Sequence, residues 1–136
     1  MKKIVLLIGL SLLLSTNGYA ACAEGTEVTG KNGHVYCRSN IPLNWYSALA
    51  WCDAHGRTLA TIEQMCDIDE TQKWDGNVGS GKCLNIIDAY SSYSLVWTAT
   101  VWPVSYNSFT VALPSGNVSK AHRTAASSNN LYALCW

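Results

Sequence analysis

Cysteine is the residue type that most constrains the chemistry of this 136-residue chain. The six cysteines are Cys22, Cys37, Cys52, Cys66, Cys83 and Cys135. Zinc sites and redox-active thiols use closely spaced pairs such as Cys-x-x-Cys, and no such pair occurs here, so we expect neither. An even number of cysteines in an exported chain is typical of a disulfide framework. We therefore expect three disulfides, and the spacing alone does not choose among the possible pairings.

Histidines and acidic residues give no catalytic signature. His34, His55 and His122 are scattered, each without a nucleophile and an acid in a recognised spacing. A carboxylate pair for glycoside hydrolysis stays open, since any two acids can meet in space, but most of the nine acids have the setting of surface or turn residues. We expect no enzymatic activity and no cofactor.

One acidic stretch resembles a calcium site only superficially. It contains Asp67, Asp69, Glu70 and Asp75. The stretch lacks the spacing of an EF-hand loop, because its glycine falls at position 76 and not at the sixth loop position. We interpret it as a solvated helix end and expect no metal site.

The first twenty residues have the layout of a secretory signal. A Met-Lys-Lys start is followed by an apolar run to Leu14 and by small or polar residues up to Ala20. That run is about 11 residues, shorter than the roughly 20 that a spanning helix needs. The less favoured alternatives are an uncleaved anchor and a lipoprotein acylated at Cys22, because Tyr19 stands where such signals usually carry leucine. We expect secretion to the periplasm, cell surface or medium, with no transmembrane segment.

Residues 21–136 are enough for a single domain with its own core. Without Lys2 and Lys3, seven basic residues face nine acidic ones, a net charge of −2. This balance provides no basic stripe, so we expect no nucleic-acid partner. Thirteen aromatic residues remain after Tyr19 is removed, more than a small core usually requires. Some of them should lie on the surface.

Capping signals predict two helices. Asn44 can cap the first helix, and Gly56 ends it because glycine adopts a left-handed backbone cheaply. Thr61 and Gln64 have the capping-box spacing at the start of the second helix. Helical periodicity places one set of side chains on the buried faces. They are Trp45, Ala48, Leu49 and Cys52 in the first helix, and Ile62, Met65 and Cys66 in the second.

Short strands make up most of the remaining chain. Pro114-Ser115-Gly116-Asn117 predicts a hairpin turn between two of them, and residues 71–94 are expected to be irregular. Two helices ahead of an antiparallel sheet give the α+β class. The expected strands are Val35-Tyr36, 95–98, 108–113, 118–121 and 131–135.

Several short motifs occur together along the chain. They are Tyr36-Cys37, Asn44-Trp45-Tyr46-Ser47-Ala48, Trp51-Cys52, Gly56-Arg57-Thr58-Leu59-Ala60, Val96-Trp97-Thr98 and Tyr132-Ala133-Leu134-Cys135. In this order they resemble a C-type lectin-like domain, from about residue 34 to residue 136. The resemblance implies a C-type lectin-like fold, with two helices packed on a small, disulfide-stapled antiparallel sheet.

The resemblance also implies a disulfide pairing. In that family the cysteine of the first helix pairs with one in the last strand, which corresponds to Cys52–Cys135. Cys22–Cys37 resembles the additional N-terminal hairpin bridge of longer members. Cys66 and Cys83 then remain for the third bridge, which departs from the family's usual second bridge between sheet strands.

Calcium-dependent sugar binding is the best-known activity of the family, and its motifs are missing. That activity uses Glu-Pro-Asn or Gln-Pro-Asp in a long loop and Trp-Asn-Asp in a strand, which supply the oxygen ligands of calcium. Pro42, Pro103 and Pro114 have no acid or amide beside them. Only about ten residues separate the Trp97 and Phe109 strands, too few for the long loop. We expect no calcium site of this kind.

Two functions remain. The first is a secreted or surface-exposed adhesion module that binds a glycan or cell-surface protein without calcium. The second is a structural subunit of a surface or pilus assembly with no small ligand, because a fold alone does not decide function. The lysines of the signal are typical of bacterial signals and suit both. The oligomeric state stays open.

Four aromatic residues are the candidate ligand contacts. Trp102 and Tyr106 lie in a short connection between strands, where function often resides, and Tyr90 and Tyr93 lie in a serine-rich segment before the sheet. Such rings can stack on sugars or anchor a protein partner. The alternative is that Trp102 plugs the open end of the sheet. The tryptophans expected in the core are Trp45, Trp51 and Trp97.

Overall fold

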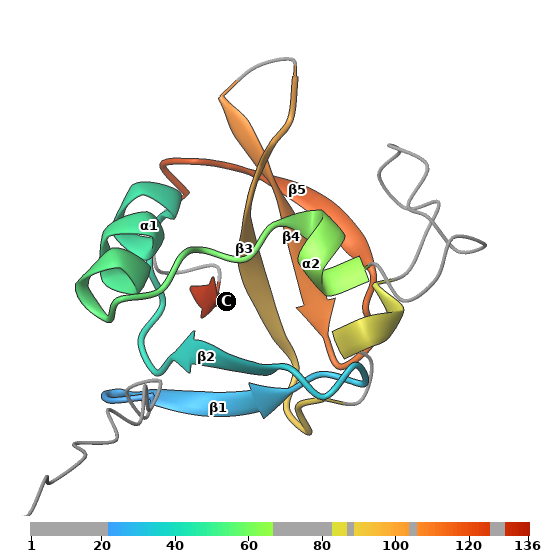
Figure 1. The fold of residues 1–136 in the computed structure, drawn as a ribbon. Coiled ribbons are helices and arrows are strands. Elements are labelled where there is room, and N and C mark those ends of the chain that lie inside the picture. The colour runs from blue at the N-terminus through green and yellow to red at the C-terminus, as the bar shows by residue number, and fades with distance from the viewer. Residues whose placement is uncertain (1–21, 67–82, 87–88, 104–105, 126–129) are drawn as a thin grey trace, which may run out of the picture.

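A computed structural model describes residues 22–66, 83–86, 89–103, 106–125 and 130–136. These residues form two α-helices and two β-sheets, which confirms the α+β class (Figure 1). In chain order the elements are β1 (Gly25–Thr29), β2 (Val35–Ser39), α1 (Trp45–Ala54), α2 (Ile62–Cys66), the short 3-10 helix η2 (Leu84–Ile86), β3 (Ser94–Val101), β4 (Asn107–Leu113), β5 (Val118–His122), β6 (Leu131–Tyr132) and β7 (Leu134–Cys135).

The strands form two sheets where the sequence predicted one. The smaller sheet has the order β1-β2-β7 and is antiparallel. The larger has the order β5-β4-β3-β6 and is mixed, because β6 runs parallel to β3 while β3, β4 and β5 alternate in direction. In Figure 1 the β1–β2 hairpin lies along the bottom of the molecule, and both α-helices lie above it. Local strand signals did not predict β1, and only the resemblance implied an N-terminal hairpin.

The predicted strand 131–135 is divided between the two sheets. β6 pairs with β3, β7 pairs with β2, and Ala133 lies between them. The Ala133 oxygen accepts a hydrogen bond from Ser39 N at 3.1 Å, and the Ala133 nitrogen donates to Ser39 Oγ at 3.0 Å. The buried Ser39 therefore satisfies both backbone groups of Ala133, and the segment crosses from one sheet to the other without losing hydrogen bonds.

Both helices begin as the capping signals predicted. Asn44 Oδ1 accepts from Ser47 N at 2.8 Å at the start of α1, and Gly56 follows the helix with φ +66°. Both bonds of the capping box are present before α2: Thr61 N donates to Gln64 Oε1 at 2.8 Å, and Gln64 N donates to Thr61 Oγ1 at 3.2 Å.

Two of the three tryptophans expected in the core are less buried than predicted. Trp97 is fully buried as expected, and its Nε1 donates to Leu43 O at 2.8 Å. Trp45 and Trp51 were also expected in the core, but both are only partly buried. Ala48 and Cys52 make up the buried face of α1. The large rings lie at the margins of that face and reach the surface.

The disulfides follow the expected pairing. They are Cys22–Cys37, Cys52–Cys135 and Cys66–Cys83, and together they use all six cysteines. The second joins α1 to β7, across a separation of 83 residues. Three disulfides fit an oxidising compartment outside the cytoplasm.

The segment 71–94 was expected to be irregular, but where the structure describes it η2 (Leu84–Ile86) forms and β3 begins at Ser94, and the rest lies outside the described residues. Two further sequence predictions concern segments wholly outside them. They are the signal segment 1–20 and the acidic stretch that contains Asp67, Asp69, Glu70 and Asp75. Among the described residues, no helix has the length and apolar character needed to cross a bilayer.

Candidate functional site

β3 separates the four aromatic residues proposed as ligand contacts. Tyr90 and Tyr93 precede this strand, and Trp102 and Tyr106 follow it. The strand has eight residues, and at about 3.3 Å per residue it is roughly 25 Å long. The four residues therefore divide into two pairs at opposite ends of β3 and do not form one site.

The pair before β3 contains one structural and one exposed ring. The guanidinium of Arg38, a residue with 6% exposure, lies between the rings of Tyr90 and Tyr132, with Cζ 4.3 Å from each centroid. Arg38 Nη2 also donates to Tyr90 Oη at 2.6 Å. Tyr90 thus helps to hold a buried cation through cation–π contact and a hydrogen bond. Tyr93 is 71% exposed.

The pair after β3 divides in the same way. Trp102 is partly buried and meets Phe109 edge to face, with ring centroids 5.0 Å apart. Lys120 Nζ lies 4.7 Å from the Trp102 ring centroid. Tyr106 is 72% exposed, the largest exposure among the large hydrophobic side chains of the described residues. Trp102 therefore packs against the core, and Tyr106 is available to a ligand.

Tyr106 belongs to an aromatic and cationic cluster that the sequence did not predict. Arg123 N donates to Tyr106 O at 2.8 Å, and Trp45 N donates to Arg123 O at 3.1 Å. The Arg123 guanidinium lies over the Trp45 ring, 4.9 Å from its centroid. These bonds tie the start of β4 and the end of β5 to the start of α1. We call the cluster of Trp45, Tyr46, Tyr106, His122 and Arg123 the Trp45 surface.

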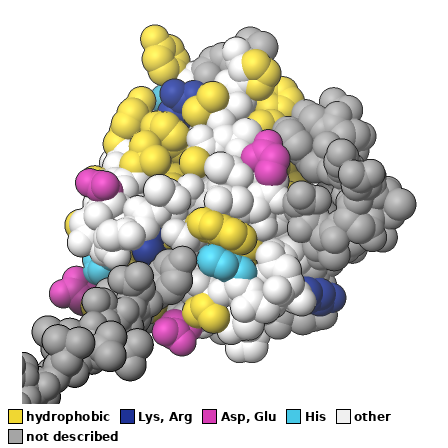
Figure 2. Space-filling model, in the orientation of Figure 1, with side chains coloured by type: hydrophobic (Ala, Val, Ile, Leu, Met, Phe, Trp, Pro, Cys, Tyr) yellow, Lys and Arg dark blue, Asp and Glu magenta, His cyan; other side chains and the backbone are white. Residues whose placement is uncertain are grey.

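The outer rings of the Trp45 surface extend it toward solvent. Tyr46 is 50% exposed and meets Trp45 edge to face at 5.3 Å. The Tyr106 and His122 rings lie 6.2 Å apart. Trp45 is fixed beneath them, because its Nε1 donates to Thr98 O at 2.9 Å. Figure 2 shows hydrophobic side chains gathered around a basic and a histidine side chain on the side of the molecule where α1 lies.

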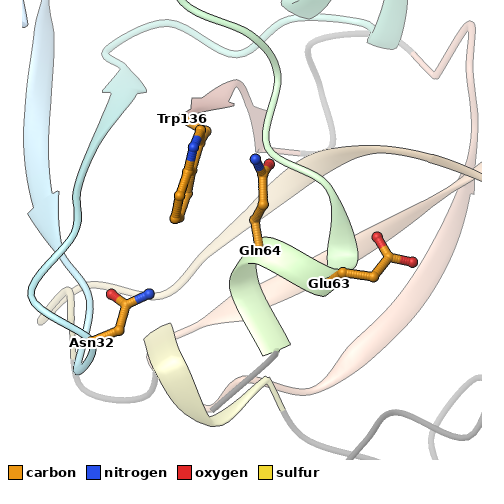
Figure 3. A pocket seen from close by; sticks show the side chains of 4 residues that line it. All are labelled: Asn32, Glu63, Gln64 and Trp136. Atoms are coloured by element: carbon orange, nitrogen blue, oxygen red, sulfur yellow. The ribbon is translucent and has the colours of Figure 1, made fainter. Parts of the chain in front are cut away.

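A pocket of about 340 Å³ lies elsewhere, between the β1–β2 turn, α2 and Trp136 (Figure 3). Asn32, Glu63, Gln64 and Trp136 line it. Trp136 is held by the backbone, because its nitrogen donates to Thr58 O at 2.8 Å. It is also held by its ring, which stacks on His34 with centroids 3.4 Å apart and an interplanar angle of 10°.

Beneath this pocket a buried polar network fixes two of its walls. Tyr36 Oη donates to Gln64 O at 2.8 Å and accepts from Asn85 Nδ2 at 2.7 Å. Asn85 Oδ1 accepts from Asn32 N at 2.8 Å. Burial raises the pKa of Tyr36 to about 12, although hydrogen bonds with Asn32 and Asn85 oppose the rise. Tyr36 is therefore a neutral hydroxyl at physiological pH, able to donate and to accept at once.

The other chemistry-bearing side chains do not form a site within the described residues. No group of three or more His, Cys, Asp or Glu residues there is arranged to hold a metal ion. His55 Nδ1 lies 2.7 Å from Trp51 O, and His122 Nδ1 lies 2.7 Å from Thr124 Oγ1. The side chains of the Trp45 surface and of the Trp136 pocket offer stacking, cation–π contact and hydrogen bonding to a ligand.

Sequence reasoning missed most of these residues for identifiable reasons. Helical periodicity assigned Trp45 to the core, and no motif marked Arg123. An available signal was the pair Trp45-Tyr46, since neighbouring positions on a helix point about 100° apart and cannot both face the core. Trp136 and Asn32 belong to no local pattern.

Comparisons with known proteins found no matching protein-family model and no curated protein of significant similarity.

Proposed function

We propose that this protein is an exported, calcium-independent binding module with a C-type lectin-like fold, which recognises a glycan or a cell-surface protein. The observation that carries the proposal is the Trp45 surface, where exposed rings and a guanidinium share one face. Aromatic and arginine side chains are the groups that dominate binding energies at interfaces. Tyr46 and Tyr106 are rigid and exposed, so they can bury area on a ligand with little loss of entropy.

The fold assignment is supported by the order of the elements and by the sequence motifs. A helix tied to the last strand by Cys52–Cys135, and an N-terminal hairpin tied by Cys22–Cys37, agree with the resemblance. Independence from calcium is supported by the short connection between β3, which ends at Val101, and β4, which begins at Asn107.

A structural subunit is the alternative function, and one feature weighs against it. β5 is an edge strand of the larger sheet, and an unprotected edge can add strands from another chain. Lys120 and His122 are exposed on this strand. Charged residues, lysine above all, discourage such pairing.

A glycan and receptor array probed with the purified, oxidised protein tests this proposal, with and without EDTA. We expect a reproducible ligand that survives EDTA and is lost in Tyr106→Ala. Tyr93→Ala, which removes an equally exposed tyrosine at the other end of β3, should bind like the wild type. Absence of any ligand, together with concentration-dependent self-association in sedimentation, would favour the structural subunit instead.

A further inference from the structure

We propose that the pocket beside Trp136 binds one neutral pyranose unit, with the sugar ring against the free face of the indole. The proposal goes beyond the function proposed above and does not rest on the Trp45 surface. It rests on the aromatic wall, the polar rim and the buried support of this pocket.

Only one face of the Trp136 ring is open to a ligand. His34 lies parallel to the other face, with the ring centroids 3.4 Å apart. Figure 3 shows the indole nearly in profile, with the Gln64 side chain across from it. A flat apolar wall opposite a polar side chain matches a pyranose, which has C–H groups on its faces and hydroxyls around its edge. Binding sites of this type combine an apolar wall with a few placed polar groups.

The polar rim presents amide donors in a fixed orientation. Gln64 Oε1 accepts from Thr61 N, and Asn32 Oδ1 accepts from His34 N at 2.9 Å. A backbone N–H can be bound only by the oxygen of a side-chain amide, so these contacts determine which way each amide points. The NH₂ groups of both residues are consequently directed to the other side, and in Figure 3 both nitrogens lie on the side toward Trp136. One N–H of Asn32 is used by Tyr36, which leaves its second N–H for a ligand.

The charge of the lining residues selects a neutral ligand. Glu63 is the one charged residue among the four that line the pocket, and its carboxylate accepts from Thr100 Oγ1 at 3.3 Å. In Figure 3 this carboxylate points away from Trp136, and the four lining residues include no cation that could pair with an acidic sugar. Sugar hydroxyls, which both donate and accept, suit the amides of Asn32 and Gln64.

The buried hydrogen-bond network beneath the pocket favours binding of a ligand without rearrangement of the protein. Asn85 is fully buried and joins the backbone of Asn32 to Tyr36, which in turn holds the backbone of Gln64. Asn85 Nδ2 also reaches Gln64 O at 3.2 Å. Both amide-bearing walls are therefore fixed before the ligand arrives, which lowers the entropy cost of binding.

NMR titration of the isotope-labelled protein tests the proposal with methyl glycosides of glucose, galactose, mannose and N-acetylglucosamine. We expect at least one glycoside to shift the Trp136 indole N–H and the side-chain amides of Asn32 and Gln64, with a dissociation constant on the order of 1 mM. Tyr106→Ala should bind that glycoside like the wild type.

Isosteric variants distinguish the loss of contacts in the pocket from a general loss of folding. Asn32→Asp and Gln64→Glu keep the oxygen that accepts the backbone N–H and remove the NH₂ donor. Each should weaken binding about tenfold or more. Asn40→Asp is the matched control, since Asn40 Oδ1 also accepts a hydrogen bond, from Thr26 Oγ1, beyond the opposite end of β2. It should bind normally.

Three results would overturn the proposal. They are the absence of shifts with all four glycosides, unchanged affinity in Asn32→Asp and Gln64→Glu, and shifts confined to the Trp45 surface. The last result would leave the proposed function supported, so the two proposals can fail separately.

Discussion

The guanidinium of Arg123 lies over the indole ring of Trp45, 4.9 Å from its centroid. The backbones of the same two residues are hydrogen-bonded at 3.1 Å. This double connection holds the end of β5 against the start of α1, although 78 positions separate the residues in the sequence. A surface fixed in this way offers Tyr46 and Tyr106 to a ligand from a rigid base.

Truncation of Tyr106 and of Trp102 should have different effects on stability. Tyr106→Ala removes an exposed ring and should change the free energy of unfolding by less than about 0.5 kcal/mol. Trp102→Ala removes a ring that packs on Phe109 and should cost roughly 2 kcal/mol, less than a fully buried aromatic. Urea unfolding followed by circular dichroism measures both. Equal losses would show that Tyr106 is also structural.

Loss of the Cys52–Cys135 disulfide should harm folding most. It spans 83 residues, against 15 for Cys22–Cys37. In the chain-entropy model the longer loop contributes about 4–5 kcal/mol and the shorter about 3 kcal/mol. Paired alanine substitutions, compared by chemical denaturation, measure this order, and non-reducing peptide mapping checks the pairing. A larger loss for Cys22→Ala with Cys37→Ala would contradict the expectation.

Acidification should weaken the fold through His34. Burial, and secondarily the charge of Arg57, lowers the pKa of His34 below 6.5. The folded state therefore favours neutral imidazole, and the unfolded chain binds a proton more readily. This contribution to stability is complete above about pH 6.5 and is lost as the pH falls through the folded-state pKa.

His34→Phe is the matched variant for this pH effect, because it keeps a ring against Trp136 and removes the titration. Thermal melts between pH 7.5 and 5.5 should show a larger decrease in the wild type than in the variant. Parallel decreases would mean that His34 does not couple folding to pH.

Chelation should leave both stability and ligand binding unchanged. The described residues contain no group suited to a metal, and the proposed contacts are rings, amides and a guanidinium. Melting temperature and affinity in EDTA should equal those in calcium within error. A decrease in EDTA that calcium reverses would point instead to the acidic residues between Asp67 and Asp75.

Local signals predicted those parts of the fold that depend on near neighbours. The Asn44 cap and the Thr61–Gln64 capping box join residues three positions apart. The division of the last strand could not be predicted in this way, because it depends on hydrogen bonds between Ser39 and Ala133, 94 residues apart. Pairing of β6 with β3 is likewise set by tertiary packing.

The candidate sites were less predictable than the fold. Tyr106 was proposed from its loop position and is exposed. Trp45 was assigned to the core, because periodicity gives the direction in which a side chain points. It does not tell how much of that side chain the neighbouring elements cover. The pocket joins Asn32, Gln64 and Trp136 from three separate segments, so no single stretch of sequence contains its pattern.

The affinity of the double variant Tyr46→Ala, Tyr106→Ala for the array ligand tests the central claim most directly. Tyr93→Ala serves as the control, and circular dichroism verifies folding. We predict that the double variant melts like the wild type and binds at least about tenfold more weakly, while Tyr93→Ala binds normally. Wild-type affinity in the folded double variant would contradict the assignment of the Trp45 surface as the ligand-binding site.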